Sequence, residues 1–157
     1  MVNYDVIIIG LGPTSGTLAN LLGMQGNSVL ILEKEASLFP LPRAVHFDDE
    51  IMRVFQTIGI TNKFLKQTII NKGTKFVNSK GETLIDWPRP KFITENGWRP
   101  SYRFHQPDLE RSLRKNLKKF KNITIKQNAN AVNILSTTNY VETTFEENKT
   151  LKKIKSK

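Results

Sequence analysis

The stretch VIIIGLGPTSGTLANLLG, residues 6–23, decides the fold of this chain. Its opening apolar run has no polar alternation, which is typical of a strand buried on both faces of a parallel sheet. Gly10 and Gly12 form a turn that opens a helix expected over 14–25. A second buried strand, SVLILE, ends at Glu33. This order of strand, helix and strand predicts a right-handed βαβ unit, and with it an α/β fold with a parallel sheet.

Length and composition limit what this fold can belong to. The chain has 157 residues and no cysteine, so we expect one domain or part of one, without disulfides or thiolate metal sites. Its N-terminus lacks the basic start and cleavage site of a signal peptide, and no apolar run approaches the ~20 residues that span a bilayer. We therefore expect a soluble cytoplasmic protein without a membrane partner.

The net charge of +10 is concentrated near the C-terminus. Residues 1–110 carry 12 Lys and Arg against 11 Asp and Glu, whereas residues 111–157 carry 12 against 3. In the helix expected over 107–120, an apolar stripe leaves four basic residues on a solvated face: Arg111, Arg114, Lys115 and Lys118. The tail 149–157 is rich in lysine. Because no aromatic residues alternate with these cations, we expect solvated charge and no nucleic-acid partner.

The middle of the chain changes its periodicity. A helix over 48–60 is expected to begin at Asp48 as N-cap, and a shorter one follows at 62–67. From Gly73 the pattern alternates around an Asn-Ser-Lys-Gly turn, which predicts a β-hairpin excursion. Further strands are expected at 101–106, at 123–127 and in a second hairpin that turns near Thr138 and Asn139. The organisation is thus 1–72 (βαβ and helices), 73–105 (β excursion) and 106–157 (helix, strands and basic tail).

The glycine turn has the chemistry of a phosphate site. A pyrophosphate must be approached by backbone N–H groups and a helix N-terminus, where side chains would interfere. Gly10 allows a tight exit from the strand, and Gly12 lets the main chain approach the phosphates. Ser15 stands where the usual fingerprint has its third glycine, but Gly16 follows it, so we expect a slightly looser crossing. The inner face of this helix is expected to hold Leu18, Leu21 and Leu22.

Glu33 completes the predicted site. It ends the second strand 21 positions after Gly12, where a carboxylate accepts hydrogen bonds from a ribose diol. An acidic residue there argues against a ribose 2′-phosphate and hence against NADP. The residues by themselves leave FAD and NAD open.

Three stretches carry a family resemblance: GLGPTSGTLANLLG (10–23), LPRAVHFDDEIMRVFQTIGI (41–60) and FHQPDLERSLR (104–114). In order and spacing the chain resembles the N-terminal part of the class A FAD-dependent aromatic hydroxylases, which are monooxygenases. Within the family the resemblance is closest to the 3-(3-hydroxyphenyl)propionate hydroxylases. It implies a Rossmann-like FAD-binding domain over 1–157.

The resemblance also implies roles for individual residues. Those that would face the FAD pyrophosphate are Gly10, Gly12, Pro13, Thr14 and Ser15. Glu33 would hold the adenosine ribose, Lys34 would lie near the adenine, Arg43 would reach the flavin side, and Gln106 would contact the ribityl and phosphate region. In the family, NADH or NADPH reduces the flavin and O2 then hydroxylates a phenolic acid such as 3-(3-hydroxyphenyl)propionate. No catalytic residue is assigned within these stretches.

Two further expectations follow. Family members continue with a Gly-Asp segment and a substrate domain, so we expect a hydroxylase truncated before that domain, with a non-catalytic nucleotide- or anion-binding module or an inactive gene fragment as the alternative. The HFDDE segment (46–50) invites a metal site, but its carboxylates are explained as a helix start, and no metal is expected.

Overall fold

The computed structural model describes residues 3–157, and it divides into two compact units. The first unit contains the chain up to Leu41 together with Leu109–Lys157. The second unit is the intervening segment Pro42–Asp108. Each unit is described by itself below.

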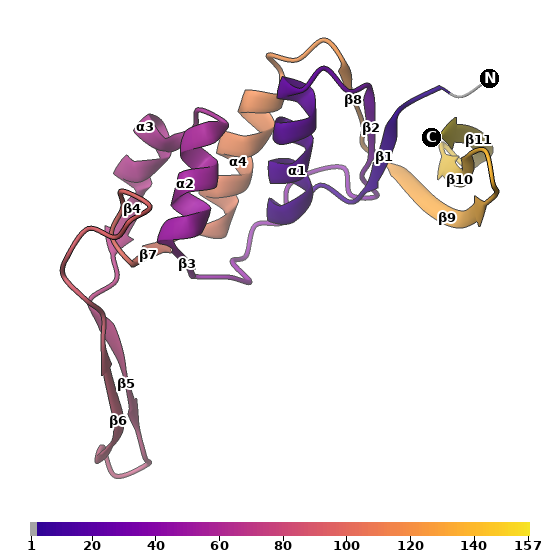
Figure 1. The fold of residues 1–157 in the computed structure, drawn as a ribbon. Helices are drawn as coiled ribbons and strands as arrows, with labels where there is room; N and C mark the ends of the chain where they lie inside the picture. The colour runs from indigo at the N-terminus through magenta and orange to yellow at the C-terminus, as the bar shows by residue number, and fades with distance from the viewer. Residues whose placement is uncertain (1–2) are drawn as a thin grey trace. The chain divides into compact units, whose positions relative to one another are not determined.

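The first unit is built on the predicted βαβ arrangement (Figure 1). Strand β1 (Val6–Ile9) leads through the glycine turn into helix α1 (Pro13–Met24), and strand β2 (Val29–Leu32) follows. β2 pairs in parallel with β1 on one side and with β8 (Ile123–Lys126) on the other. The predicted α/β class and parallel sheet are therefore confirmed.

β2 is buried because it is covered on both faces. Val29 and Ile31 pack with Ala19 of α1 in one hydrophobic cluster. Leu30 and Leu32 pack in a second cluster with Phe145 and Ala129, which belong to a separate antiparallel sheet. Alternate side chains of a strand point to opposite faces, so a strand covered on both sides needs an unbroken apolar run.

The inner face of α1 differs in part from the prediction, since Leu22 packs against the hydrophobic core as expected but Leu18 does not. Its buried residues are Gly16, Ala19, Asn20 and Gly23, whereas Leu18 is 44% exposed. The reason is close packing against helix α4 (Gln106–Leu117), which lies beside α1 (Figure 1). A Cβ added at Gly16 would stand 3.3 Å from Leu113 of α4. At so short a separation, small residues face the partner helix and the larger leucine turns outward.

The C-terminal segment forms an antiparallel sheet in the order β11-β10-β9. Its strands are β9 (Ala129–Ser136), β10 (Val141–Glu147) and β11 (Thr150–Ser156). The hairpin predicted near Thr138 and Asn139 is confirmed. The lysine-rich end is a strand and not a tail, whereas its Lys152 and Lys153 side chains are exposed, as expected of solvated charge. The lysine-rich residues pair along β10, because their backbone completes a sheet edge whatever charge their side chains carry.

The second unit surrounds a cluster of aromatic rings. A small antiparallel sheet has the order β3 (His46–Asp48), β7 (Ser101–Phe104) and β4 (Thr68–Ile70). Helix α2 (Asp49–Thr57), helix α3 (Thr61–Phe64) and a 3-10 turn, η1 (Leu65–Gln67), complete the unit. The rings that meet are Phe47, Phe55, Phe64, Tyr102 and Phe104. The short strands β3 and β4 were not predicted, because three residues carry too little periodicity.

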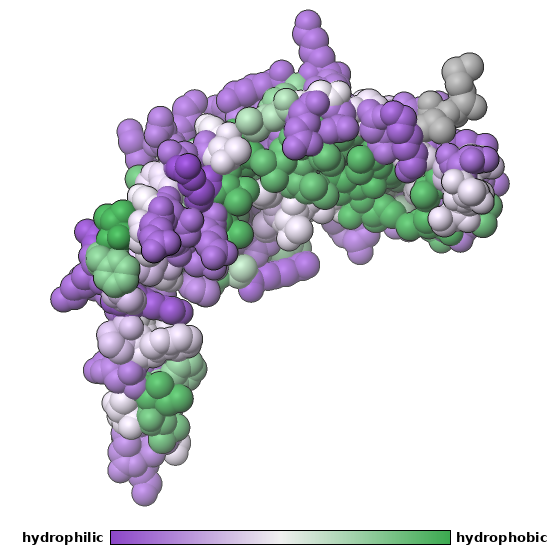
Figure 2. All heavy atoms as spheres, viewed as in Figure 1, coloured by the Kyte–Doolittle hydropathy of each residue, from purple (hydrophilic) through white to green (hydrophobic). Residues whose placement is uncertain are grey.

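The predicted hairpin excursion also belongs to the second unit. β5 (Gly73–Val77) pairs with β6 (Thr83–Pro88) around a turn in which the Gly81 N–H donates to the Asn78 carbonyl oxygen at 3.0 Å. Phe76 and Ile85 are cross-strand partners and are about half exposed. Figure 2 shows the hydrophobic residues that gather along the hairpin.

Within the described residues, no helix combines the length and apolar character needed to cross a membrane.

Candidate cofactor site

The glycine turn is fixed by backbone geometry. Gly10 has a φ of +86°, a left-handed conformation that side chains disfavour, and its N–H donates to the Leu32 carbonyl oxygen at 2.8 Å. Gly12 is the N-cap of α1, and its carbonyl oxygen accepts from the Gly16 N–H at 2.8 Å. The turn thus joins β1 to α1 while remaining attached to β2.

The N-terminus of α1 is open to an anion. No side chain caps it, no acidic residue lies in its first turn, and Pro13 is its first helical residue. The first N–H groups of an α-helix have no partner within the helix, and the helix dipole places positive potential there. Thr14 is exposed and Ser15 is half-buried at this end. Their backbone N–H groups are therefore placed to meet phosphate oxygens.

Gly12 leaves a space that the protein does not use. Its φ of −86° is accessible to any residue, and a Cβ added there would have nothing within 4 Å. Neither backbone conformation nor packing in the described chain thus requires glycine at this position. The space suits a ligand that approaches the main chain closely.

Glu33 lies at the end of β2, beside the turn. Its side chain is buried, with Oε2 accepting from the Leu11 N–H at 2.6 Å and Oε1 accepting from the Glu35 N–H at 2.9 Å. The carboxylate therefore has a fixed orientation in addition to its predicted role toward a ribose. Lys34 is exposed and lies 3.8 Å from the Glu35 carboxylate, a surface pair of little energetic weight.

Arg43 and Gln106 are brought together in the second unit. The buried Gln106 side chain accepts through Oε1 from the backbone N–H groups of Arg43 and Ala44, at 2.9 and 2.8 Å. Gln106 thus holds the backbone that carries the Arg43 side chain. The contacts of both residues with a cofactor remain predictions.

One contact at the turn was missed in the sequence. Arg114, expected on the solvated face of α4, has a side chain only 18% exposed and donates to the Leu11 carbonyl oxygen at 3.0 Å. Glu110 lies one helical turn before it, with 3.6 Å between carboxylate and guanidinium. The expectation for Arg114 was wrong. Helical periodicity divides a helix into an apolar and a polar face, but it does not show which polar residues are covered when another element packs closely against the helix. The sequence did contain one indication, since Glu110 and Arg114 are four positions apart, the spacing of an ion pair on one side of a helix.

The HFDDE segment is a helix start. Asp48 caps α2 by accepting from the Ile51 N–H at 3.0 Å. Asp49 accepts from the Thr94 hydroxyl at 2.6 Å and the Asn96 amide at 2.7 Å, and these bonds lower the pKa of its carboxyl. Among the residues that the structure describes, no three His, Cys, Asp or Glu side chains gather as metal ligands would.

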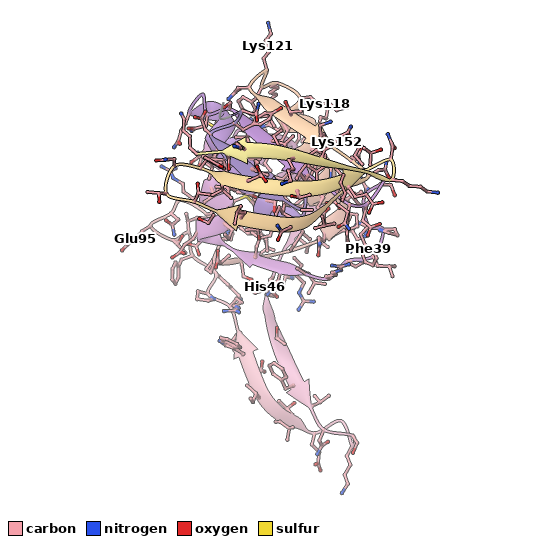
Figure 3. All side chains as sticks on the ribbon, turned by 90° about the vertical axis from the view of Figure 1, so that its right-hand side faces the viewer. Phe39, His46, Glu95, Lys118, Lys121 and Lys152 are labelled. Atoms are coloured by element: carbon pink, nitrogen blue, oxygen red, sulfur yellow. The ribbon has the colours of Figure 1, made fainter. Side chains whose placement is uncertain are left out.

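Lysines of β11 and its surroundings pair with carboxylates. Lys153 lies 2.8 Å from Glu142, and Glu147 accepts from Lys126 at 3.0 Å and also from Lys152, which is labelled in Figure 3. Through these pairs the sheet neutralises part of the positive charge that the sequence concentrates there.

Fold and turn together define a dinucleotide-binding domain: a parallel sheet, a glycine turn opening a helix, and a carboxylate closing the second strand. Comparison with known families agrees, since residues 3–157 match the FAD binding domain family. The chain belongs to this family.

Curated relatives support the predicted resemblance to aromatic hydroxylases. A probable NADH-specific resorcinol 4-hydroxylase of Rhodococcus jostii (strain RHA1) is 45% identical over 111 residues, covering 69% of this chain and 20% of that protein. A 3-(3-hydroxy-phenyl)propionate/3-hydroxycinnamic acid hydroxylase of Mycolicibacterium gilvum (strain PYR-GCK) is 34% identical over 144 residues, covering 92% of this chain and 25% of that protein. The chain spans about a fifth to a quarter of the length of these relatives.

Solved structures share the fold. The p-nitrophenol 4-monooxygenase PnpA of Pseudomonas putida DLL-E4 superposes with a TM-score of 0.88 at 20% identity, covering 99% of this chain and 40% of that one. The flavin-dependent monooxygenase PieE, solved in complex with FAD and substrate, superposes with a TM-score of 0.82 at 15% identity. The match covers 98% of this chain and 29% of that one. The Rossmann-like architecture predicted from the glycine turn is confirmed.

Proposed function

We propose that this chain binds FAD as the N-terminal cofactor domain of a monooxygenase that hydroxylates a phenolic compound, such as 3-(3-hydroxyphenyl)propionate, with NADH as reductant. Membership of the FAD binding domain family supports the cofactor. The names of the relatives support the substrate class, and the relative that is 45% identical supports NADH.

The observation that carries the proposal is the unused space at Gly12. Gly12 has an ordinary φ and an open Cβ direction, so neither backbone conformation nor packing gives a reason for glycine over the other common N-cap residues. A pyrophosphate in contact with the main chain supplies that reason. The uncapped N-terminus of α1 beside it supplies N–H donors and positive potential.

The residues present suit the cofactor. Gly12, Thr14 and Ser15 would meet the pyrophosphate through their backbones, and Glu33 would accept from the ribose hydroxyls. Arg43 and Gln106, in the second unit, would serve the flavin side. The bound flavin supplies the redox chemistry, while the chain binds and orients it.

A titration of the purified chain with FAD, followed by flavin fluorescence, tests the proposal. Gly12→Val places methyl groups where the phosphates would lie and is expected to weaken binding at least about a hundredfold, or about 2.7 kcal/mol. Its unfolding midpoint is expected to fall only modestly, because a Cβ there meets no protein atom although valine is a poorer N-cap than glycine. Met24→Val, on the exposed last turn of the same helix, is the matched control.

Each outcome decides something definite. Saturable binding that Gly12→Val abolishes and Met24→Val preserves supports the proposal. A folded parent chain that does not saturate with FAD contradicts it. Binding that survives Gly12→Val but weakens steeply as salt rises would instead favour an anion-binding module that uses the basic residues.

A further inference from the structure

The Leu11 residue is held from two sides. Its N–H donates to the Glu33 carboxylate at 2.6 Å, and its carbonyl oxygen accepts from Arg114 Nη2 at 3.0 Å. Its side chain is 3% exposed. Leu11 lies between the two glycines of the turn. These two hydrogen bonds therefore fix the orientation of both of its peptide groups, the one shared with Gly10 and the one shared with Gly12.

We propose that Arg114 is a positioning residue for the phosphate-binding turn, a role that rests on the proposed FAD binding. The Leu11 carbonyl and the Gly12 N–H belong to one planar trans peptide, in which C=O and N–H point in opposite directions. A guanidinium that holds the oxygen therefore directs the Gly12 N–H to the other side. Gly12 is the residue beside the open space, so Arg114 aims a donor at the site without touching the ligand.

Packing does not account for an arginine at this position. The Arg114 side chain is 18% exposed and its Glu110 partner 7%, so both charges lie largely out of water. Arg114 Nε is buried and has no hydrogen-bond partner among the described residues. Such a donor costs free energy, and buried ion pairs can often be replaced by apolar residues without loss of stability. An arginine at this position donates a hydrogen bond to the Leu11 carbonyl oxygen, whereas a methionine of similar length has no donor for it.

The helix that presents Arg114 is rigidly placed. Asn116 donates from Nδ2 to Asn20 Oδ1 at 2.8 Å, and Asn20 donates in turn to the Gly16 carbonyl oxygen at 2.7 Å. The bond between Asn116 and Asn20, with a second from Asn20 Nδ2 to the Leu113 carbonyl oxygen at 3.3 Å, joins α4 to α1, the helix that the turn opens. A charged group that extends from such a fixed element can hold a loop in one conformation.

The test compares three variants of the full chain: Arg114→Met, Arg114→Lys and the control Lys118→Met. Lys118 lies one helical turn further along and is exposed (Figure 3). Amide hydrogen exchange of Leu11 is measured without nucleotide, the dissociation constant of FAD is measured by fluorescence, and the unfolding midpoint is measured in urea.

Arg114→Met is expected to accelerate exchange at Leu11, whose N–H donates to Glu33, and to raise the FAD dissociation constant, each at least about tenfold, as loss of one charge-assisted hydrogen bond would. Exchange at Leu30 and Ile31 of β2 is expected to stay unchanged. Arg114→Lys keeps a charged donor and is expected to recover much of both effects, and Lys118→Met to match the parent. A purely structural role would lower the unfolding midpoint and leave the affinity of the folded chain as it was.

The two proposals fail separately. If the parent chain does not bind FAD, the proposed function fails, while exchange at Leu11 still decides the role of Arg114. If exchange and affinity in Arg114→Met equal those of the parent, the positioning role is overturned. Should Arg114→Met not fold because Glu110 is left buried, the double variant Glu110→Gln/Arg114→Met removes that charge and is compared with Glu110→Gln on the same measurements.

Discussion

Glycines of the first unit serve three different purposes, and only the structure separates them. Gly10 adopts a φ that other residues avoid. Gly12 has an ordinary φ and faces open space, which points to a ligand. Gly23 makes room for other elements, since a Cβ there would stand 2.9 Å from Ile123 Cδ1 and 3.0 Å from the Phe120 ring.

Gly23→Val is therefore expected to give the reverse of Gly12→Val. Forcing a larger side chain into a packed contact costs ~1–3 kcal/mol of unfolding free energy. The FAD affinity of the molecules that remain folded is expected to change less than about twofold, because Gly23 lies at the far end of α1 from the turn. Urea unfolding and FAD titration of the same samples check both. Loss of FAD affinity without loss of stability would contradict this assignment.

At the scale of elements, the contact of α1 with α4 depends on two buried asparagines. Asn20 and Asn116 are 0% and 5% exposed. Asn116 Nδ2 donates to Asn20 Oδ1, and Asn20 Nδ2 donates to the carbonyl oxygens of Gly16 and Leu113. Buried amides without partners are costly, so the pair fixes the register between the helices as well as contributing to stability.

Asn116→Leu is expected to lower the unfolding free energy by ~1–3 kcal/mol, because it leaves Asn20 Oδ1 without its donor. The double variant Asn20→Leu/Asn116→Leu is expected to lose less than the sum of the two single changes, since neither amide is then left alone. A double-mutant cycle of urea unfolding measures the difference. Strict additivity would show that the two side chains do not act together.

At the scale of the whole molecule, carboxylates join distant parts of the chain. Asp5, just before β1, accepts from the Ser28 N–H at 2.8 Å, from the Ser28 hydroxyl at 2.7 Å and from Lys157 at the C-terminus. These bonds, with Lys157 first, hold the pKa of the Asp5 carboxyl far below its usual range. The bonds from Lys152 and Lys126 likewise lower the pKa of Glu147.

These shifts predict acid sensitivity. A carboxyl whose pKa is lower in the folded than in the unfolded state stabilises the fold above the unfolded pKa, near 3.8 for Asp5 and 4.5 for Glu147. That contribution is lost as the pH falls through the lowered folded pKa. The unfolding free energy is thus expected to be nearly constant from pH 7 to about 5 and to fall below about 4.5.

Asp5→Asn isolates the contribution of one group. The variant is expected to be less stable than the parent chain at pH 7 and to lose less stability between pH 5 and 3. Lys157→Met removes one partner and keeps Ser28, so an intermediate slope is expected. Urea unfolding at several pH values, followed by circular dichroism, provides the measurement. Equal slopes in all three chains would show that Asp5 is not a source of the acid sensitivity.

Local patterns in the sequence were enough to predict several parts of this protein. The apolar runs predicted β1 and β2, the glycines between them predicted the turn and α1, and Asp48 predicted the start of α2. Each of these signals lies within a few residues of the feature it predicts. The family resemblance added Arg43 and Gln106, which no local pattern would have connected, and the structure joins them through a hydrogen bond.

Features that depend on contacts between distant residues became visible only in the folded chain. Arg114 reads as a solvated residue of a basic helix until α4 lies against α1 and its guanidinium meets Leu11, 103 positions earlier. The lysine-rich end reads as a tail until β10 offers it backbone partners. In both cases the side-chain chemistry is visible in the sequence, but the partner is set by long-range packing. The burial of a residue, and hence its role, depends on which surface covers it.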